Sequence, residues 1–377
     1  MNKAEQFIKD RLEARTVNVS LRKLSTKTFP VDFSSNDYLG FAKSSELSKL
    51  TGQLLSAIPE RRNGSGGSRL LSGNHPFIEE TESLIASFHR AESGLIFNSG
   101  YDANIGLLSA LAQRGDTIIT DELIHASLID GARLTHANRY TFKHNDLQDL
   151  QAKLNVAKGN VYVVVESVYS MDGDLSPLKE ISELCLVHDA ALIVDEAHAT
   201  GIFGHHGAGL VQQLQLEKHV FARIVTFGKA LGVHGAIVLC SENLRAYLIN
   251  FSRSFIYTTA APLHNIAAIR SGYQLLKERD YTMDIQRKIN YYRAHLEASG
   301  KAFVAGKSAI QTVQFPGNAN AREAAELLQS QGLDVRPILS PTVPEGKERI
   351  RICLHIFNTD EEITLLADHL LAIKKDE

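Results

Sequence analysis

The sequence is poor in the features that stabilise small secreted proteins or carry metals. Its three cysteines, Cys185, Cys240 and Cys353, are far apart and form no CxxC pair. This spacing argues against a disulfide framework and against a zinc site, and it indicates buried, reduced thiols. No HExxH motif supplies a regular set of metal ligands either. We therefore expect no structural or catalytic metal.

Long apolar runs are also missing. No run approaches the roughly 18–20 residues that a membrane-spanning helix needs. Residues 1–15 are charged throughout and lack the apolar core of a signal peptide. By default, this predicts a cytoplasmic protein with no membrane partner.

A charge excess of one sign is absent as well. The net charge is −3 and both signs are interspersed, so no electrostatic argument favours a nucleic-acid partner. No GxGxxG motif follows a first strand, which argues against a nicotinamide dinucleotide site. The composition is that of an ordinary globular protein, and 377 residues are enough for two domains.

The main pattern is an alternation of short apolar runs with helical segments, from residue 95 to about residue 262. The runs 161–165 and 191–194 show no polar alternation, which is typical of strands that are buried on both faces. A helix is expected between them, over 177–188. Repeated strand–helix–strand units predict a mostly parallel sheet that helices cover, which is an α/β fold.

The character of the chain changes after Pro262. Helices are expected first, over 265–278 and 284–299. Short strands and further helices then alternate, over 312–315, 320–331, 334–337, 349–354 and 360–374. We interpret this part as a smaller α+β domain. The predicted domains are an N-terminal helix and segment that pack with the small domain (1–45), a large domain (46–262) and the small domain (263–377).

Four features within the large domain carry chemistry. Gly100 opens a helix, so backbone N–H groups there can bind a phosphate. His125 and Asp195 each follow a predicted strand, at the edge where open α/β sheets bind ligands. Lys229 lies in an otherwise apolar stretch flanked by glycines, where a desolvated amine becomes a nucleophile and base.

Each feature alone has an ordinary alternative: a helix start, a surface histidine, or a solvated loop lysine. Asp195 could also join His198 and His205 or His206 in a metal site, although the spacing is irregular. One ligand, however, accounts for all four features. It would place a phosphate at Gly100, a ring face on His125, a protonated ring nitrogen at Asp195 and an aldehyde on Lys229.

From about residue 20 to the end of the chain, the sequence resembles the α-oxoamine synthases. These are fold-type I pyridoxal phosphate enzymes that join an amino acid to an acyl thioester with loss of CO₂. The matching segments are FSSNDYLG (33–40), GSGGSRLLSGN (64–74), NSGYDAN (98–104), SMDGD (170–174), DEAHATG (195–201), TFGKALG (226–232) and PTVPEGKERIRI (341–352). The resemblance implies a seven-stranded, mostly parallel sheet and a homodimer with shared active sites.

The resemblance also implies residue roles. Lys229 would carry the cofactor as a Schiff base, Asp195 would pair with the pyridine nitrogen, and His125 would stack on the ring. His198 and Ser170 would contact the ring's phenolic oxygen or its surroundings. The remaining roles are phosphate binding and carboxylate binding. Phosphate binding is implied for Gly100, Tyr101 and Thr226, with Thr258 or Thr259 from the partner subunit; amino-acid carboxylate binding is implied for Asn36 and Arg351.

Within the family, the SMDGD and PTVP segments and the compact length favour the members that condense L-alanine with a pimeloyl thioester. Arg22 and Thr342 match positions that touch the acyl substrate there. Glycine C-acetyltransferase, serine palmitoyltransferase and 5-aminolevulinate synthase remain alternatives, as does a non-catalytic regulator on the same fold. The sequence has no DNA-binding extension that such a regulator would carry. His234 stands where many relatives have serine, which leaves the fine substrate preference open. The sequence does not fix the acyl carrier, coenzyme A or acyl-carrier protein.

Overall fold

The computed structural model describes residues 2–60, 62–298 and 306–373. Contacts divide the chain into two compact units. The larger unit contains residues 36–170 and 174–285, and the smaller unit contains residues 1–35, 171–173 and 286–377. Within the described residues, none of the helices has the length and apolar character required to cross a bilayer.

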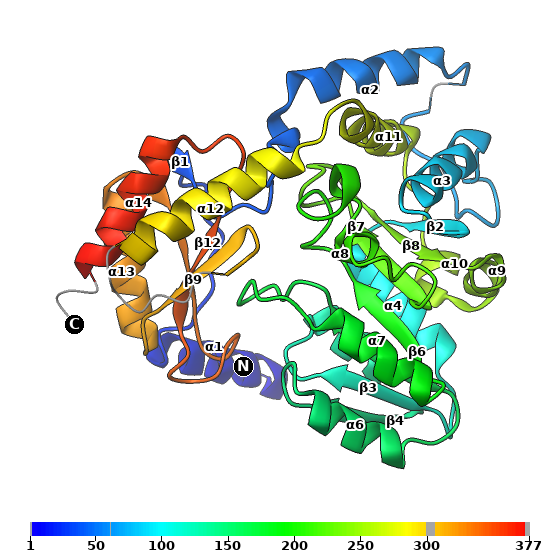
Figure 1. Ribbon diagram of the computed structural model, residues 1–377, viewed down its shortest axis with the longest axis horizontal. Coiled ribbons are helices and arrows are strands. Elements are labelled where there is room, and N and C mark those ends of the chain that lie inside the picture. The colour runs from blue at the N-terminus through cyan, green and yellow to red at the C-terminus, as the bar shows by residue number, and fades with distance from the viewer. Residues whose placement is uncertain (1, 61, 299–305, 374–377) are drawn as a thin grey trace. The chain divides into compact units, whose positions relative to one another are not determined.

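The larger unit is built on a sheet that has seven strands among the described residues, in the order β2-β8-β7-β6-β5-β3-β4 (Figure 1). Neighbouring strands pair in parallel from β7 to β4, and β8 is antiparallel to both β7 and β2. The strands are β2 (Ser93–Phe97), β3 (Thr117–Asp121), β4 (Asn138–Phe142), β5 (Val161–Glu166), β6 (Ala191–Asp195), β7 (Ala222–Thr226) and β8 (Ala236–Cys240). The expected α/β fold with a mostly parallel seven-stranded sheet is confirmed.

Helices cover this sheet because its inner strands are buried and apolar on both faces, as in β5, β6 and β8. For example, α4 packs on β7 and β8, and α7 packs on β6 (Figure 1). The larger unit's helical segments are η1 (Phe41–Lys43), α2 (Ser45–Ala57), α3 (Pro76–Phe88), α4 (Gly100–Leu111), α5 (Ala126–Arg133), α6 (Leu147–Val156), α7 (Leu178–Val187), η2 (His205–Gly207), α8 (Leu210–Gln213), α9 (Glu242–Phe251), α10 (Arg253–Ile256) and α11 (Leu263–Glu278).

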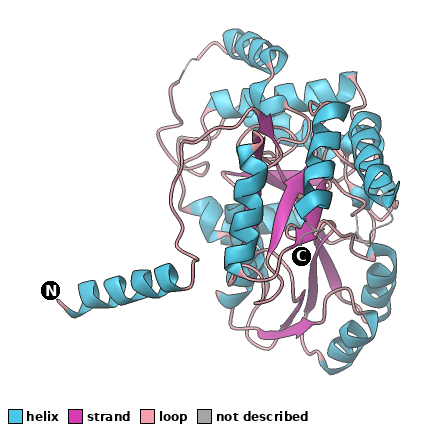
Figure 2. Ribbon diagram, turned by 90° about the vertical axis from the view of Figure 1, so that its left-hand side faces the viewer, coloured by secondary structure: helices cyan, strands magenta, loops and turns pink. Residues whose placement is uncertain are grey.

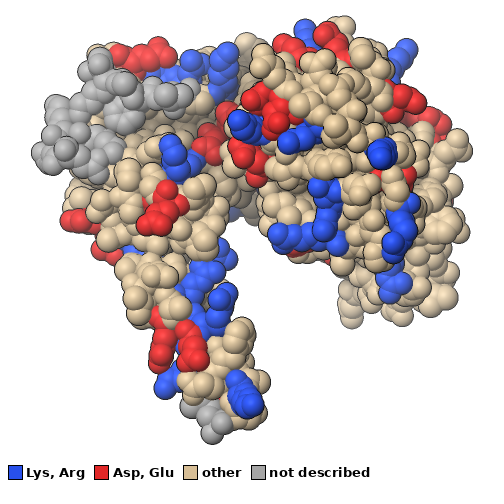
Figure 3. Space-filling view, turned by 90° about the horizontal axis from the view of Figure 1, so that it is seen from below, with Lys and Arg blue, Asp and Glu red and all other residues tan. Residues whose placement is uncertain are grey.

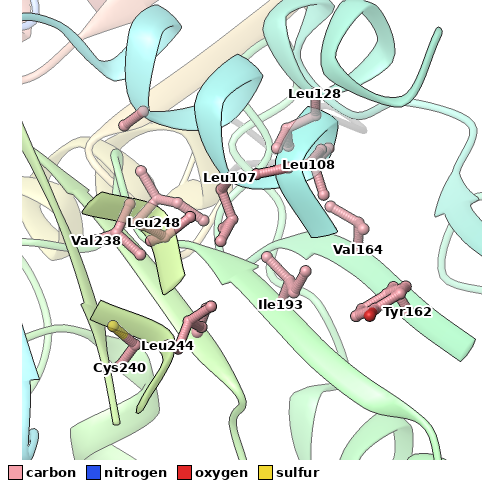
Figure 4. Close-up of a cluster of buried hydrophobic side chains, with 14 of the residues drawn as sticks. Leu107, Leu108, Leu128, Tyr162, Val164, Ile193, Val238, Cys240, Leu244 and Leu248 are labelled. Atoms are coloured by element: carbon pink, nitrogen blue, oxygen red, sulfur yellow. The ribbon is translucent and has the colours of Figure 1, made fainter. Parts of the chain in front are cut away.

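One core cluster lies between the sheet and helices α4, α5 and α9 (Figure 4). Leu107 and Leu128 come from α4 and α5, and both are fully buried. They meet Val164 of β5 and Ile193 of β6. Burying each such side chain contributes about 1.5–3 kcal/mol. This packing fixes α4 against the sheet, and so fixes the position of its N-terminus.

The smaller unit combines short strands with helices. β1 pairs in parallel with β10, and β12 lies between β11 and β9 in an antiparallel sheet. The elements are α1 (Lys3–Val17), β1 (Val31–Asp32), α12 (Thr282–Ala298), β9 (Ile310–Gln314), α13 (Asn318–Ser330), β10 (Leu333–Asp334), β11 (Arg336–Ile338), β12 (Arg349–Cys353) and α14 (Asp360–Ile373). The first residues of α12 belong to the larger unit. Helix α1 has no buried residue and projects away from the strands (Figure 2).

Two expectations about organisation differ from the structure. The unit boundary lies between Ile285 and Gln286 and not at residue 262, because α11 packs on α2 and α3 of the larger unit. Residues 36–45 likewise belong to the larger unit. The single strand expected over 334–337 is two strands, because β10 pairs with β1 whereas β11 pairs with β12.

Charged side chains of both signs are distributed over the face that Figure 3 shows. This distribution accompanies the net charge of −3.

Candidate active site

The candidate site lies at the carboxyl edge of the sheet in the larger unit. Strands β3, β5, β6 and β7 are parallel neighbours, so the residues that follow them emerge at one edge. His125 follows β3, Ser170 follows β5, and Lys229 follows β7, while Asp195 is the last residue of β6. β2 and β7 are both antiparallel to β8, so they run in the same direction. Helix α4, which follows β2, therefore begins at this edge too.

Lys229 lies in a tight turn directly after β7. The backbone N–H of Gly232 donates to the carbonyl of Lys229 at 2.9 Å, and that of Val233 donates to the carbonyl of Phe227 at 3.0 Å. Gly232 has φ +62°, and a Cβ there would collide with the backbone of Ala42, so the turn needs glycine. This closed turn gives the lysine side chain a defined starting point at the edge of the sheet.

The lysine amine belongs to a hydrogen-bonded series of side chains. Lys229 Nζ lies 2.8 Å from Nε2 of His198, and the other ring nitrogen of His198 lies 2.7 Å from the hydroxyl of Tyr38. His198 is buried, Tyr38 is fully buried, and Lys229 is half-buried. An amine held against an imidazole in this way is suited to receive and pass on a proton.

Asp195 is a buried carboxylate at the end of β6, with 5% of its surface exposed. Its oxygens accept hydrogen bonds from the side-chain amide of Asn104 and from the backbone N–H of Ala197, each at 2.9 Å. Both donors are neutral. A buried carboxylate favours a cationic partner, because desolvation penalises an uncompensated charge. The protonated nitrogen of a pyridine ring would meet that requirement.

His125 caps α5 beside this carboxylate. Its Nδ1 lies 2.7 Å from the hydroxyl of Ser127, which also accepts a hydrogen bond from Asn104. Burial lowers the pKa of His125; nearby Asp195 opposes this effect and Lys229 adds to it. His125 therefore lies within electrostatic range of both predicted cofactor anchors.

The N-terminus of α4 forms the opposite end of the site. Ser99 caps the helix through a hydrogen bond from the N–H of Asp102. A Cβ built on Gly100 would lie only 3.4 Å from the hydroxyl oxygen of Thr226, so these two residues adjoin one another. The Tyr101 hydroxyl donates to Asp130 at 2.6 Å, which leaves its backbone N–H as its predicted phosphate contact. Helix N-termini of this kind bind phosphate.

The other predicted site residues lie as follows. The Thr258 hydroxyl and the Thr259 carbonyl both accept hydrogen bonds from Asn98, near the start of α4. Asn36 accepts a hydrogen bond from Tyr38 in the larger unit. Arg22, Thr342 and Arg351 belong to the smaller unit.

Two of these residues are joined in the smaller unit. Arg22 donates to the Thr342 hydroxyl at 3.0 Å, and both side chains are exposed. Arg351, on β12, donates to the sulfur of Cys353 at 3.1 Å. Among the described residues, no group of three or more histidine, cysteine, aspartate or glutamate side chains is arranged to hold a metal ion.

Several residues at this edge were missed by the sequence reasoning. Tyr38 and Asn104 lie inside the motifs FSSNDYLG and NSGYDAN, but nothing local showed their partners. Glu166 ends the apolar run of β5 just as Asp195 ends β6, and that shared pattern was the available signal. His144 bridges two carboxylates, those of Asp121 and Asp174.

His144 holds two loops of the edge together. Its ring nitrogens lie 3.0 Å from Asp121 and 2.7 Å from Asp174. Burial alone would lower the pKa of His144, but these two carboxylates outweigh it and raise the pKa to about 10. Asp121 precedes the turn that leads to His125, and Asp174 closes the loop that begins at Ser170. The bridging imidazolium therefore connects the supports of both predicted cofactor contacts.

Comparisons with known proteins agree with this geometry. The model of the family described as aminotransferase class I and II matches residues 30–370. The chain belongs to this family. It is 43% identical to the 8-amino-7-oxononanoate synthase of Emericella nidulans, over 94% of this chain and 92% of that protein.

Two solved structures share the fold. Serine palmitoyltransferase of Sphingomonas wittichii has a TM-score of 0.88 and 26% identity, and the match covers 100% of this chain and 98% of that one. The 8-amino-7-oxononanoate synthase of Francisella tularensis has a TM-score of 0.77 and 27% identity, covering 92% and 97% of the two chains. The expected resemblance to the α-oxoamine synthases, the cofactor pyridoxal phosphate and the class of pyridoxal phosphate-dependent acyltransferase are confirmed.

Proposed function

We propose that this chain condenses L-alanine with a pimeloyl thioester to give 8-amino-7-oxononanoate, CO₂ and the free thiol, a step of biotin synthesis. The observation that carries the proposal is the Lys229 amine, held 2.8 Å from His198 at the sheet edge that also presents the buried Asp195. The similarity to synthases of this name, over nearly the whole chain, supports the choice of substrates.

The residues of the larger unit would hold the cofactor as follows. Lys229 would bind its aldehyde carbon, Asp195 its ring nitrogen and His125 its ring face. The N-terminus of α4 at Gly100, together with Tyr101 and Thr226, would bind the phosphate. Ser170 and His198 would contact the phenolic oxygen. Bound in this way, pyridoxal phosphate supplies an electron sink for the bond electrons released at the amino acid's Cα.

The proton chemistry falls to the chain itself. Once alanine has displaced it, the Lys229 amine would remove the Cα proton, since a neutral amine is a competent general base. His198 accepts or donates at Nε2, and the Tyr38 hydroxyl fixes its other nitrogen at 2.7 Å. The new carbon–carbon bond forms at the thioester carbonyl with departure of the thiolate. After loss of CO₂, the same lysine would return its proton to Cα.

Four residues are proposed to recognise the two substrates. Arg351 suits the alanine carboxylate because a guanidinium pairs with a carboxylate through two parallel hydrogen bonds. Asn36 would add a further contact there. Arg22 and Thr342 would bind the pimeloyl chain. A guanidinium has five N–H donors, so one bond to Thr342 leaves the capacity to bind the terminal carboxylate of that chain.

We also propose a cytoplasmic homodimer. The support is the family resemblance, which implies active sites shared between two subunits. Thr258 and Thr259, the residues that would be shared, adjoin the exposed Tyr257. In the dimer, one of the two threonine hydroxyls would reach the partner's cofactor phosphate. The three cysteines are buried thiols that form no disulfide, as expected in a reducing compartment.

A product assay tests the proposal. The purified protein is supplied with pyridoxal phosphate, L-alanine labelled with ¹³C in the carboxyl group, and pimeloyl-coenzyme A. The expected result is ¹³CO₂ together with a product of the mass of 8-amino-7-oxononanoate. Product from glycine with acetyl-coenzyme A, or from serine with palmitoyl-coenzyme A, and none from alanine would refute the substrate assignment while leaving the family intact.

A mixing experiment tests the shared site. Lys229→Ala protein and Thr258→Ala/Thr259→Ala protein are each nearly inactive by the proposal. After the two are co-expressed, a hybrid dimer contains one site with both native elements, so activity should return to roughly a quarter of that of wild type. No recovery in a preparation shown to contain hybrids would rule out the shared site.

A further inference from the structure

Glu166 is a buried carboxyl that the proposed chemistry does not use. It is the last residue of β5 and is paired in register with Asp195, the last residue of β6. Side chains alternate along a strand, and Val164 and Ile193, two residues earlier, both belong to the core beneath α4 and α5. Glu166 and Asp195 therefore face the same side of the sheet as neighbours, and they are 2% and 5% exposed.

The two carboxyls have different surroundings. Asp195 accepts hydrogen bonds from Asn104 and Ala197, which stabilise its anionic form. Glu166 has one fully buried oxygen, Oε1, that meets no hydrogen-bond donor among the described residues. A buried oxygen without a donor costs much less on a neutral group than on an anion. The difference favours the proton on Glu166.

The other groups that face Glu166 come from three neighbouring segments. The backbone N–H groups of His125 and Ser170 lower the pKa of its carboxyl, and so does the positive charge of the Lys229 amine. The Tyr169 phenol lies close enough to interact with it electrostatically. Burial, and then Asp195, outweigh the three stabilising contacts and raise the pKa of Glu166 to about 8.

Two adjacent carboxyls in a low-dielectric site do not both ionise readily, because each anion penalises the other. One of the pair retains its proton in the neutral range. If both were ionised, the edge would carry two buried negative charges, whereas the protonated ring nitrogen of the proposed site balances only one.

We propose that Glu166 is a positioning residue that stays protonated at neutral pH, holds the main chain at His125 and Ser170, and leaves Asp195 as the single anion at the ring nitrogen. The inference rests on the proposed role of Asp195. Its function is to fix two cofactor-contacting residues through their backbone without adding charge to the site.

Infrared spectroscopy on the protein without cofactor tests the protonation state directly. At pH 7, the wild type should show the carbonyl stretching band of a buried carboxylic acid, and Glu166→Gln should lose it. Glu348 provides a matched control. Its carboxyl is buried, which tends to raise its pKa. Hydrogen bonds from the backbone N–H groups of Gly317 and Gly346 outweigh this effect, so the pKa of Glu348 is lowered overall. Glu348→Gln should leave the band unchanged.

The pH dependence of stability provides a second readout without activity. The pKa of Glu166 is higher in the folded state than the ordinary value of 4.5. The free energy of unfolding therefore falls as pH rises from about 4.5 to about 8, because the unfolded chain releases this proton first. Above about pH 8 this loss of stability is constant. The melting temperature of apo Glu166→Gln minus that of apo wild type should therefore increase over that pH interval and stay constant above it.

Activity then separates positioning from proton transfer. Glutamine has the shape and hydrogen-bonding groups of a protonated glutamate, so Glu166→Gln should keep kcat and cofactor affinity within about threefold at pH 7. Glu166→Ala should weaken cofactor binding, because it removes the carboxyl that is proposed to hold the main chain at His125 and Ser170. An absent infrared band at pH 7, or a loss of about 100-fold or more in kcat for a folded Glu166→Gln protein, would overturn the inference. If the wild type itself made no product, the proposed function would fail while the infrared result stood unaffected.

Discussion

The guanidinium of Arg22 donates a hydrogen bond to the hydroxyl of Thr342, across 320 positions of the sequence. Both residues belong to the smaller unit. The family resemblance implies that both residues contact the acyl substrate, and the hydrogen bond shows that their side chains are neighbours within this unit.

This pair predicts a selective effect on the acyl substrate. Arg22→Ala should raise KM for pimeloyl-coenzyme A by about 10–100-fold, the size of losing a hydrogen bond to a charged group. KM for alanine should not change. Steady-state kinetics against each substrate measure the split, with the adjacent Lys23→Ala as the control. An equal effect on an acyl thioester that lacks a terminal carboxylate would contradict carboxylate binding by Arg22.

Lys229→Ala should abolish multiple-turnover activity, with a fall of about 10⁴-fold or more, because both the covalent attachment and the base are lost. The absorbance of lysine-bound pyridoxal phosphate should disappear as well. Lys229→Arg keeps the positive charge but cannot form the covalent link, so it should fail in the same way. An active Lys229→Ala protein with unchanged absorbance would refute the assignment.

Tyr38→Phe removes the hydroxyl that lies 2.7 Å from Nδ1 of His198. We expect kcat to fall by about tenfold, as for one hydrogen bond to a group that becomes charged. KM for alanine should change little. Tyr247→Phe, which removes a hydroxyl bonded to a carbonyl of α4, is the matched control. An unchanged kcat and pH profile for Tyr38→Phe would show that this hydroxyl does not support the imidazole.

His144 should make stability depend on pH in the alkaline range. Its pKa is raised to about 10 in the folded protein, so the stabilisation by Asp121 and Asp174 is complete below the ordinary value of 6.5. It is lost as pH rises through about 10. His144→Gln should cost about 3 kcal/mol of unfolding free energy at pH 6. Chemical denaturation at several pH values should show this difference shrinking toward pH 10, and a constant difference would contradict the charged bridge.

The buried ion pair of Glu196 and Arg223 predicts a non-additive effect on stability. The two side chains are 0% and 4% exposed and meet at 2.6 Å. Arg223→Met should destabilise the fold by about 3–5 kcal/mol, because it leaves a buried carboxylate without its cation. The double variant with Glu196→Gln should recover part of that loss. Additive losses in a double-mutant cycle would indicate that the two charges do not interact.

The sequence was informative wherever the decisive signal was local. The strands at 161–166 and 191–195 were visible as apolar runs, and Lys229 and Asp195 stood out as charged residues next to buried strands. The structure brings His125, Asp195, His198 and Lys229 to one edge of the sheet, as parallel topology predicted. Their chemical roles remain proposals.

What the sequence did not reveal depends on contacts between distant segments. Tyr38 meets His198 across 160 positions, and no local pattern marks that contact. The boundary near residue 262 was misplaced because the packing of α11 on α2 and α3 is a property of the folded chain. Glu166 shares with Asp195 the pattern of a carboxylate that ends an apolar run, but the register of β5 against β6 is what shows that the two residues are neighbours.

Helix α4 begins at Gly100 and, four residues later, presents Asn104 to Asp195. At 1.5 Å per residue, those four positions span about 6 Å along the axis. The first turn of the helix thereby sets a fixed distance between the predicted phosphate site at Gly100 and the hydrogen bond from Asn104 to Asp195. A single inserted residue would swing Asn104 about 100° around the axis. We would therefore expect chains with this chemistry to vary in length in their loops and to keep this one interval constant.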